Sequence, residues 1–260
     1  MADYILARKS RNIASSMVHV FLNILLGIGA VLITVFSASP WLGMLLVLVS
    51  KWRIFAVRKR YLWLNIKSNL VDLIVGLSVV ILAYYAGGAF LVVDFLLMGI
   101  YVLWLLVIKP MTSEVGTMIQ SLMAVFLGEC AIFIMCANVN SVAAVMLSFL
   151  VGYAASRHVL SQTDSHDFTL TTLVCGLVFS EIAWLCHSWD IIYTFGSTGI
   201  RIPQAAVILT IFAFVYNYAR LALVRNQDEF RFRSIAGPVF FGVLLIGVIV
   251  IWFSNPIFNI

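Results

Sequence analysis

The sequence predicts an all-α fold, a polytopic transmembrane bundle of about nine spans with the N-terminus cytoplasmic and the C-terminus outside. Mean hydropathy is +1.08, and charged residues make up only 10% of the 260 residues. Apolar runs of about 20 residues recur, the length at which a helix crosses a hydrocarbon core of roughly 30 Å. The alternation that would indicate membrane strands is absent.

Residues that favour turns separate the apolar runs, and they set the limits of each predicted span. The second span is the least regular, because its purely apolar part is short and Lys51 and Arg53 would have to extend to the membrane surface. If this segment does not cross, it is re-entrant or interfacial. The predicted spans are 13–36, 40–56, 68–86, 90–108, 115–137, 141–156, 168–187, 203–224 and 236–254.

The orientation follows from the basic residues. Of the 16 Lys and Arg residues, 15 fall on one side of the predicted bundle and only Arg201 falls on the other. Positive residues are retained on the cytoplasmic side, so this split predicts a cytoplasmic N-terminus. It also favours a crossing by the second span. Without that crossing, the basic loop 51–67 would lie opposite the basic N-terminus.

The spans leave room for one integral membrane domain, residues 1–260, and no soluble domain. Residues 51–67 form a basic and aromatic cytoplasmic loop, expected to lie in the interface against anionic headgroups. In one interpretation this loop only sets the topology. In the other it binds a lipid headgroup, the candidates being Lys51, Arg53, Arg58, Lys59 and Arg60. Cations held against a bilayer do not favour nucleic acid. We expect the protein to lie in a cytoplasmic (inner) or equivalent membrane. The sequence does not decide between a monomer, an oligomer and a complex with a protein partner.

Ionisable residues inside spans are costly and often functional. Asp94, Glu129, Glu181 and His187 all fall in the outer part of the predicted bundle, with Asp190 just beyond. We expect Glu129 and Glu181 to share a cavity in the outer half of the membrane, where they would bind substrate or protons. The alternative is that each acid reaches water or pairs with a neighbouring helix.

A metal site is not predicted. Glu181 and His187 are six residues apart, which places them about 120° apart around a helix rather than on one face. The sequence names no cofactor.

Small and polar residues recur every three or four positions along the first span. Small residues let membrane helices approach closely, and polar ones bond across the contact. The stripe is therefore expected to be a packing seam with His19 and Asn23 bonded to a neighbouring helix, or else part of a substrate path. Its members are Asn12, Ser16, His19, Asn23, Gly27, Ala30 and Thr34.

Three classes of function remain. The first is a carrier of a small solute, ion or lipid that uses the outer carboxylates. The second is a membrane scaffold or assembly subunit without chemistry. The third is an intramembrane enzyme acting on a lipid-linked substrate from the outer face.

Overall fold

A computed structural model describes residues 2–86, 91–137, 139, 141–161, 168–188, 191–195, 198–225 and 232–253. Side chains are described from residue 17 onward within these ranges, apart from residues 53, 55 and 224–234. The described chain is nearly all helical, as predicted, with one two-stranded hairpin.

The first half of the chain contains α1 (Ala2–Ser37), α2 (Pro40–Ser50), α3 (Trp52–Phe55), α4 (Lys59–Ser68), α5 (Leu70–Ala86), α6 (Leu91–Leu103) and the π-helical turn η1 (Trp104–Ile108). The second half contains α7 (Glu114–Cys136), α8 (Ser141–Leu160), α9 (Phe168–His187), β1 (Ile192–Thr194), β2 (Arg201–Pro203), α10 (Gln204–Arg225) and α11 (Phe232–Trp252).

Seven of the described helices are long and apolar enough to cross a membrane, so the fold is that of an integral membrane protein. The number becomes eight if α4 and α5, which meet at a bend of 63°, form one span. The predicted second span is shorter than expected. Its helix α2 has 11 residues and is therefore about 16 Å long, well below the thickness of a hydrocarbon core.

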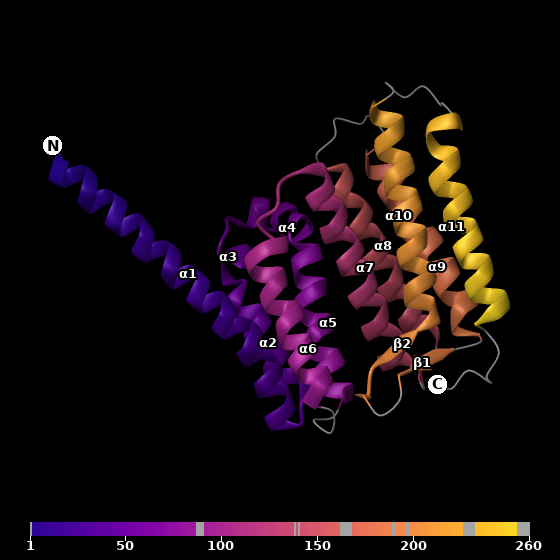
Figure 1. Ribbon diagram of the computed structural model, residues 1–260, viewed down its shortest axis with the longest axis horizontal. Helices are drawn as coiled ribbons and strands as arrows, with labels where there is room; N and C mark the ends of the chain where they lie inside the picture. Colours follow the sequence, from indigo (N-terminus) through magenta and orange to yellow (C-terminus); the bar gives the residue numbers. More distant parts are fainter. Residues whose placement is uncertain are drawn as a thin grey trace.

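The core has two parts, and α7 contributes to both. One part joins α1, α2, α5 and α6, and receives Ala124 and Leu127 from α7. The other joins α7 to α8, α9 and α10, and includes Phe133 of α7 and Phe179 of α9. In Figure 1 the helices from α5 to α11 lie roughly side by side in an up-and-down bundle, with the hairpin at its lower end.

The C-terminal half of α1 forms the predicted packing seam. Ala30 and Thr34 are fully buried, and a Cβ at Gly27 would meet Val102 of α6. The expectation for His19 is wrong, because His19 is exposed; Asn23 is only half-buried. The helix projects away from the bundle toward its N-terminus (Figure 1). The side chains of Asn12 and Ser16 lie outside the described set.

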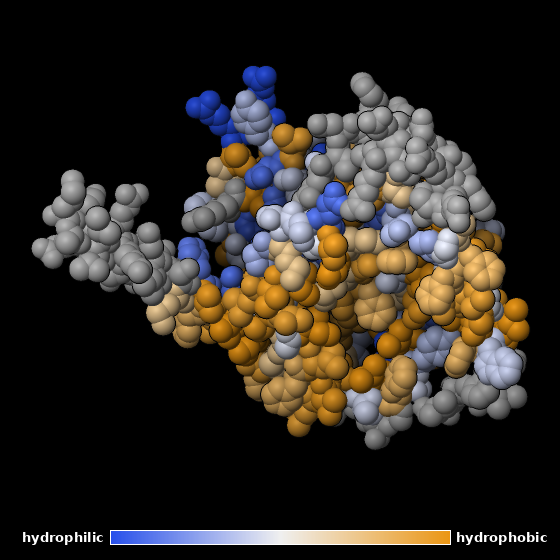
Figure 2. Space-filling model, turned by 45° about the horizontal axis from the view of Figure 1, so that its top comes forward, coloured by the Kyte–Doolittle hydropathy of each residue, from blue (hydrophilic) through white to orange (hydrophobic). Residues whose placement is uncertain are grey.

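The surface separates by hydropathy. Figure 2 shows hydrophobic residues over the lower part of one face and hydrophilic residues gathered at the upper left. Large apolar side chains such as Phe21, Phe95, Leu170 and Phe240 are exposed, each above 60%. Such a surface suits a hydrocarbon environment, since monomeric proteins in water rarely expose apolar patches of this extent.

Candidate functional site

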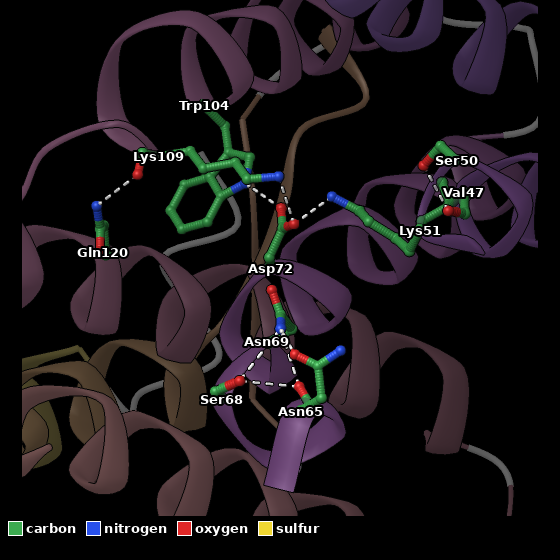
Figure 3. Close-up of polar contacts among 10 residues, drawn as sticks. All are labelled: Val47, Ser50, Lys51, Asn65, Ser68, Asn69, Asp72, Trp104, Lys109 and Gln120. Carbon is green, nitrogen blue, oxygen red and sulfur yellow. Dashed lines mark hydrogen bonds and ion pairs between the residues drawn. The ribbon is translucent and has the colours of Figure 1, made fainter. Parts of the chain in front are cut away.

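A cluster of charged side chains lies at the end of α5 that follows the basic loop (Figure 3). The carboxylate of Asp72 accepts a hydrogen bond from Trp104 Nε1 at 3.0 Å and one from Lys109 Nζ at 2.7 Å. Lys51 Nζ also donates to Asp72 Oδ2. The side chains of Lys51 and Asp72 are 7% and 9% exposed, whereas that of Lys109 is 42% exposed. The cluster therefore joins the ends of α2, α5 and α6 through one buried carboxylate.

The π-helical turn η1 places two of these donors together. The backbone N–H of Lys109 donates to the carbonyl of Trp104 at 2.8 Å, an i to i−5 bond. In an α-helix, residues five apart lie about 140° apart around the axis. The wider turn brings Trp104 and Lys109 onto one face, so that both reach Asp72. Single π-turns of this kind occur often at functional sites.

Lys51 is not at the lipid surface, where it was predicted. Because α2 is short, Lys51 follows its last turn inside the bundle and pairs with Asp72. Arg58, Lys59 and Arg60 are exposed, which fits a surface role. The side chain of Arg53 lies outside the described set. Two lysines facing one carboxylate leave the cluster with a net positive charge.

A second group of hydrogen bonds, centred on Gln120, lies at the C-terminal end of η1. Gln120 of α7 donates through Nε2 to the carbonyls of Ile108 and Met111 at 2.7 and 2.9 Å. Its Oε1 lies 2.5 Å from Nε2 of His158 in α8. The carbonyl of Ile108 also accepts the backbone N–H of Met111 at 3.1 Å. The bonds of Gln120 therefore link the chain after η1 to α7 and, through His158, to α8.

Glu129 is fully buried in α7, and its Oε2 accepts a hydrogen bond from Ser148 of α8 at 2.7 Å. Its other carboxylate oxygen has no hydrogen-bond partner among the described residues. Glu181 is exposed on α9. The two carboxylates thus differ in burial, one enclosed between α7 and α8 and the other on the surface of α9. The shared site expected from the sequence stays a prediction.

The exposure of Glu181 follows from the rotation of α9 about its axis. Cys186 faces the core of the bundle, and Glu181, five residues earlier, lies about 140° away around the helix. The sequence predicts a similar membrane depth for Glu129 and Glu181, but it does not give the rotation of α9 about its axis. His187 is half-buried, and its Nδ1 has no partner among the described residues.

Asp94 is also buried, on α6, and neither of its carboxylate oxygens has a described partner. Asp190 lies outside the described residues. In the part of the chain that the structure describes, no group of three or more His, Cys, Asp or Glu side chains is arranged to hold a metal ion.

A cavity of about 280 Å³ lies between α5, α6, α7 and the β1–β2 hairpin. Its walls are almost entirely apolar, with Leu82, Leu97, Ile100 and Phe126 from the three helices. Arg201 of β2 is the single charged residue among its described lining. This cavity lies at the end of the bundle opposite the Asp72 cluster.

Comparison with protein-family models, curated proteins and solved structures finds no match. The function is therefore argued from the chain's own geometry.

The sequence analysis missed the Asp72 cluster and the cavity. A signal for the cluster was present, because Lys51, Asp72 and Lys109 all fall at span ends on the predicted cytoplasmic side. The cavity had no such signal, since apolar wall residues resemble those of any membrane helix.

Proposed function

We propose that the protein is a nine-span membrane protein of an inner, cytoplasmic-type membrane, with its N-terminus in the cytoplasm and its C-terminus outside. The one-sided distribution of basic residues supports this orientation. The helices from α5 to α11 run in alternating directions in Figure 1, as successive crossings of one membrane would. In this arrangement α2 makes the second crossing, and Lys51 at its C-terminal end lies below the lipid headgroups. The ion pair with Asp72 neutralises the charge of Lys51 at that depth.

The topology predicts opposite signals from reporters fused to the two termini. A reporter active only in the cytoplasm should report from the N-terminus and from a fusion within residues 56–58, and a reporter active only outside should report from the C-terminus. Both termini on one side would mean an even number of spans and would remove α2 as a crossing.

Within this bundle we propose a carrier of a lipid-like molecule whose hydrocarbon chain occupies the cavity beside Ile100. The observation that carries the proposal is the combination of apolar walls, one cation and a volume of about 280 Å³. That volume is near the lower end of the roughly 300–1,000 Å³ typical of small-molecule sites, which are mostly apolar with a few polar groups. In the proposed topology the cavity lies in the outer half of the bilayer, within reach of lipid from the outer leaflet.

Filling the cavity should prevent the chain from entering. In liposomes, a single-chain alcohol carrying a photoreactive diazirine should label the wild-type protein. The variant Ile100→Trp should give about fivefold less adduct or lower, because the indole takes space that a close-packed site cannot recover. Intact-protein mass spectrometry measures the yield.

The matched control is Leu103→Trp on the same helix, since Leu103 is 49% exposed and is not part of the cavity lining. Its labelling should equal that of the wild type. Equal labelling of Ile100→Trp and the wild type would remove the cavity as the binding site.

A scaffold role is the second candidate, and α11 is the observation that favours it. Only 11% of the 18-residue apolar window of α11 is buried. A Cβ at Gly237 or Gly247 would meet nothing within 4 Å. Small residues on an uncovered membrane helix allow close approach of another helix. Such a role is compatible with lipid binding at the cavity.

A further inference from the structure

We infer that the cavity selects a single-chain lipid with an anionic headgroup and that Arg201 binds this headgroup. The inference rests on the proposed function, because it assumes that a hydrocarbon chain enters the cavity. It adds the charge of the ligand and the residue that recognises it.

The hairpin positions Arg201 at the cavity. Strand β2 pairs antiparallel with β1, with Thr194 opposite Arg201 and Tyr193 opposite Ile202. The stretch from Gly199 to Ile202 lines the cavity together with the helices. The paired strands therefore fix the backbone that carries the cation, so its place beside the apolar walls does not depend on a loose loop.

Arg201 forms no ion pair with another described residue. The ion pairs among described residues are those of Asp72 with Lys51 and Lys109, at the other end of the bundle. Among the acids predicted on the outer side, Glu129 is bonded to Ser148, Asp94 is buried without a described partner, and Glu181 is exposed. Asp190 lies outside the described residues. Arg201 itself is exposed.

A guanidinium beside an apolar cavity matches an amphiphile with a negative end. Its planar fork binds phosphate, sulfate or carboxylate oxygens in pairs. A cationic headgroup would be repelled there, and an uncharged one would gain less. The small volume accommodates one chain rather than the two chains of a phospholipid.

Three photoreactive probes with the same chain test the inference: an alkyl sulfate, the alcohol and an alkyl trimethylammonium. At equal membrane concentration the sulfate should label the wild type about threefold more than the alcohol, as expected for one exposed charge pair. The trimethylammonium probe should label least. Arg201→Gln should lose the preference for sulfate, measured as the ratio of sulfate to alcohol labelling within the same variant, and Arg201→Lys should retain most of the preference.

A second test uses the wild-type protein alone. Added NaCl screens an exposed charge pair and should therefore lower the preference of the wild type for the sulfate probe. No sulfate preference in the wild type, or an undiminished one in Arg201→Gln, overturns the inference. The proposed function then survives if Ile100→Trp still blocks the alcohol. If no probe labels in a manner that depends on Ile100, the proposed function fails and the inference fails with it.

Discussion

Replacing Asp72 by Asn should destabilise the protein by about 3–5 kcal/mol, the cost of breaking a buried ion pair on one side. Asn retains the shape of Asp and an oxygen for the Trp104 N–H, so the change removes little besides charge. Lys51, only 7% exposed, is then left without its counter-charge. The midpoint of thermal unfolding should fall by about 10 °C.

The protein's own thiols provide the measurement. All four cysteines, Cys130, Cys136, Cys175 and Cys186, are buried, so a thiol-reactive fluorescent dye reports unfolding in detergent.

The matched control is the double variant Asp72→Asn with Lys51→Met, which removes both buried charges. It should recover much of the lost stability, since a buried ion pair is often replaceable by uncharged groups at little cost. Lys109→Ala alone should have a small effect, because its side chain is 42% exposed and Lys51 still neutralises Asp72. A double variant no more stable than Asp72→Asn would contradict the role given to the charge pair.

Gly43→Val should destabilise the contacts that α2 makes with α1 and α5. A Cβ at Gly43 would overlap Thr34 Oγ1 and would lie 2.9 Å from Val80 Cγ1 and 3.1 Å from the carbonyl oxygen of Ala30. Helices α1 and α5 both meet α2 at this glycine, so neither can move away without losing other contacts. Overpacking of this kind costs about 1–3 kcal/mol or more, and the thiol assay should show the lower midpoint.

Gly99→Val is the control for this substitution. A Cβ at Gly99 would meet nothing within 4 Å, so this variant should unfold near the wild-type temperature. Similar midpoints for the two variants would mean that α1, α2 and α5 do not pack as described.

Most helix positions could be predicted from the sequence, because apolar runs bounded by turn residues determine where a membrane helix begins and ends. The predicted span 168–187 coincides with α9, and 115–137 differs from α7 by one residue at each end. The predicted segment 40–56 is longer than the helix found there, because α2 ends at Ser50, and its charged end was expected at the membrane surface. Lys51 is instead neutralised inside the bundle by Asp72, a contact between residues 21 positions apart.

The candidate sites were harder to predict, since they depend on rotation about helix axes. Glu129 and Glu181 have similar predicted depths, but one faces Ser148 and the other is exposed. No sequence pattern predicts the π-turn at Trp104, although this turn places Trp104 and Lys109 on one face of the helix. Arg201 was singled out by the charge count, but its place beside a cavity depends on how the hairpin packs against α7.

The most direct measurement for the central claim is the location of the alcohol adducts along the chain by peptide mass spectrometry. If the cavity holds the hydrocarbon chain, adducts should concentrate on lining residues from separate helices, such as Leu82, Ile100 and Phe126. Their yield should fall about fivefold or more in Ile100→Trp. Adducts spread over exposed apolar residues outside the cavity, such as Leu170 and Phe240, would show only contact with bulk lipid and would contradict the claim.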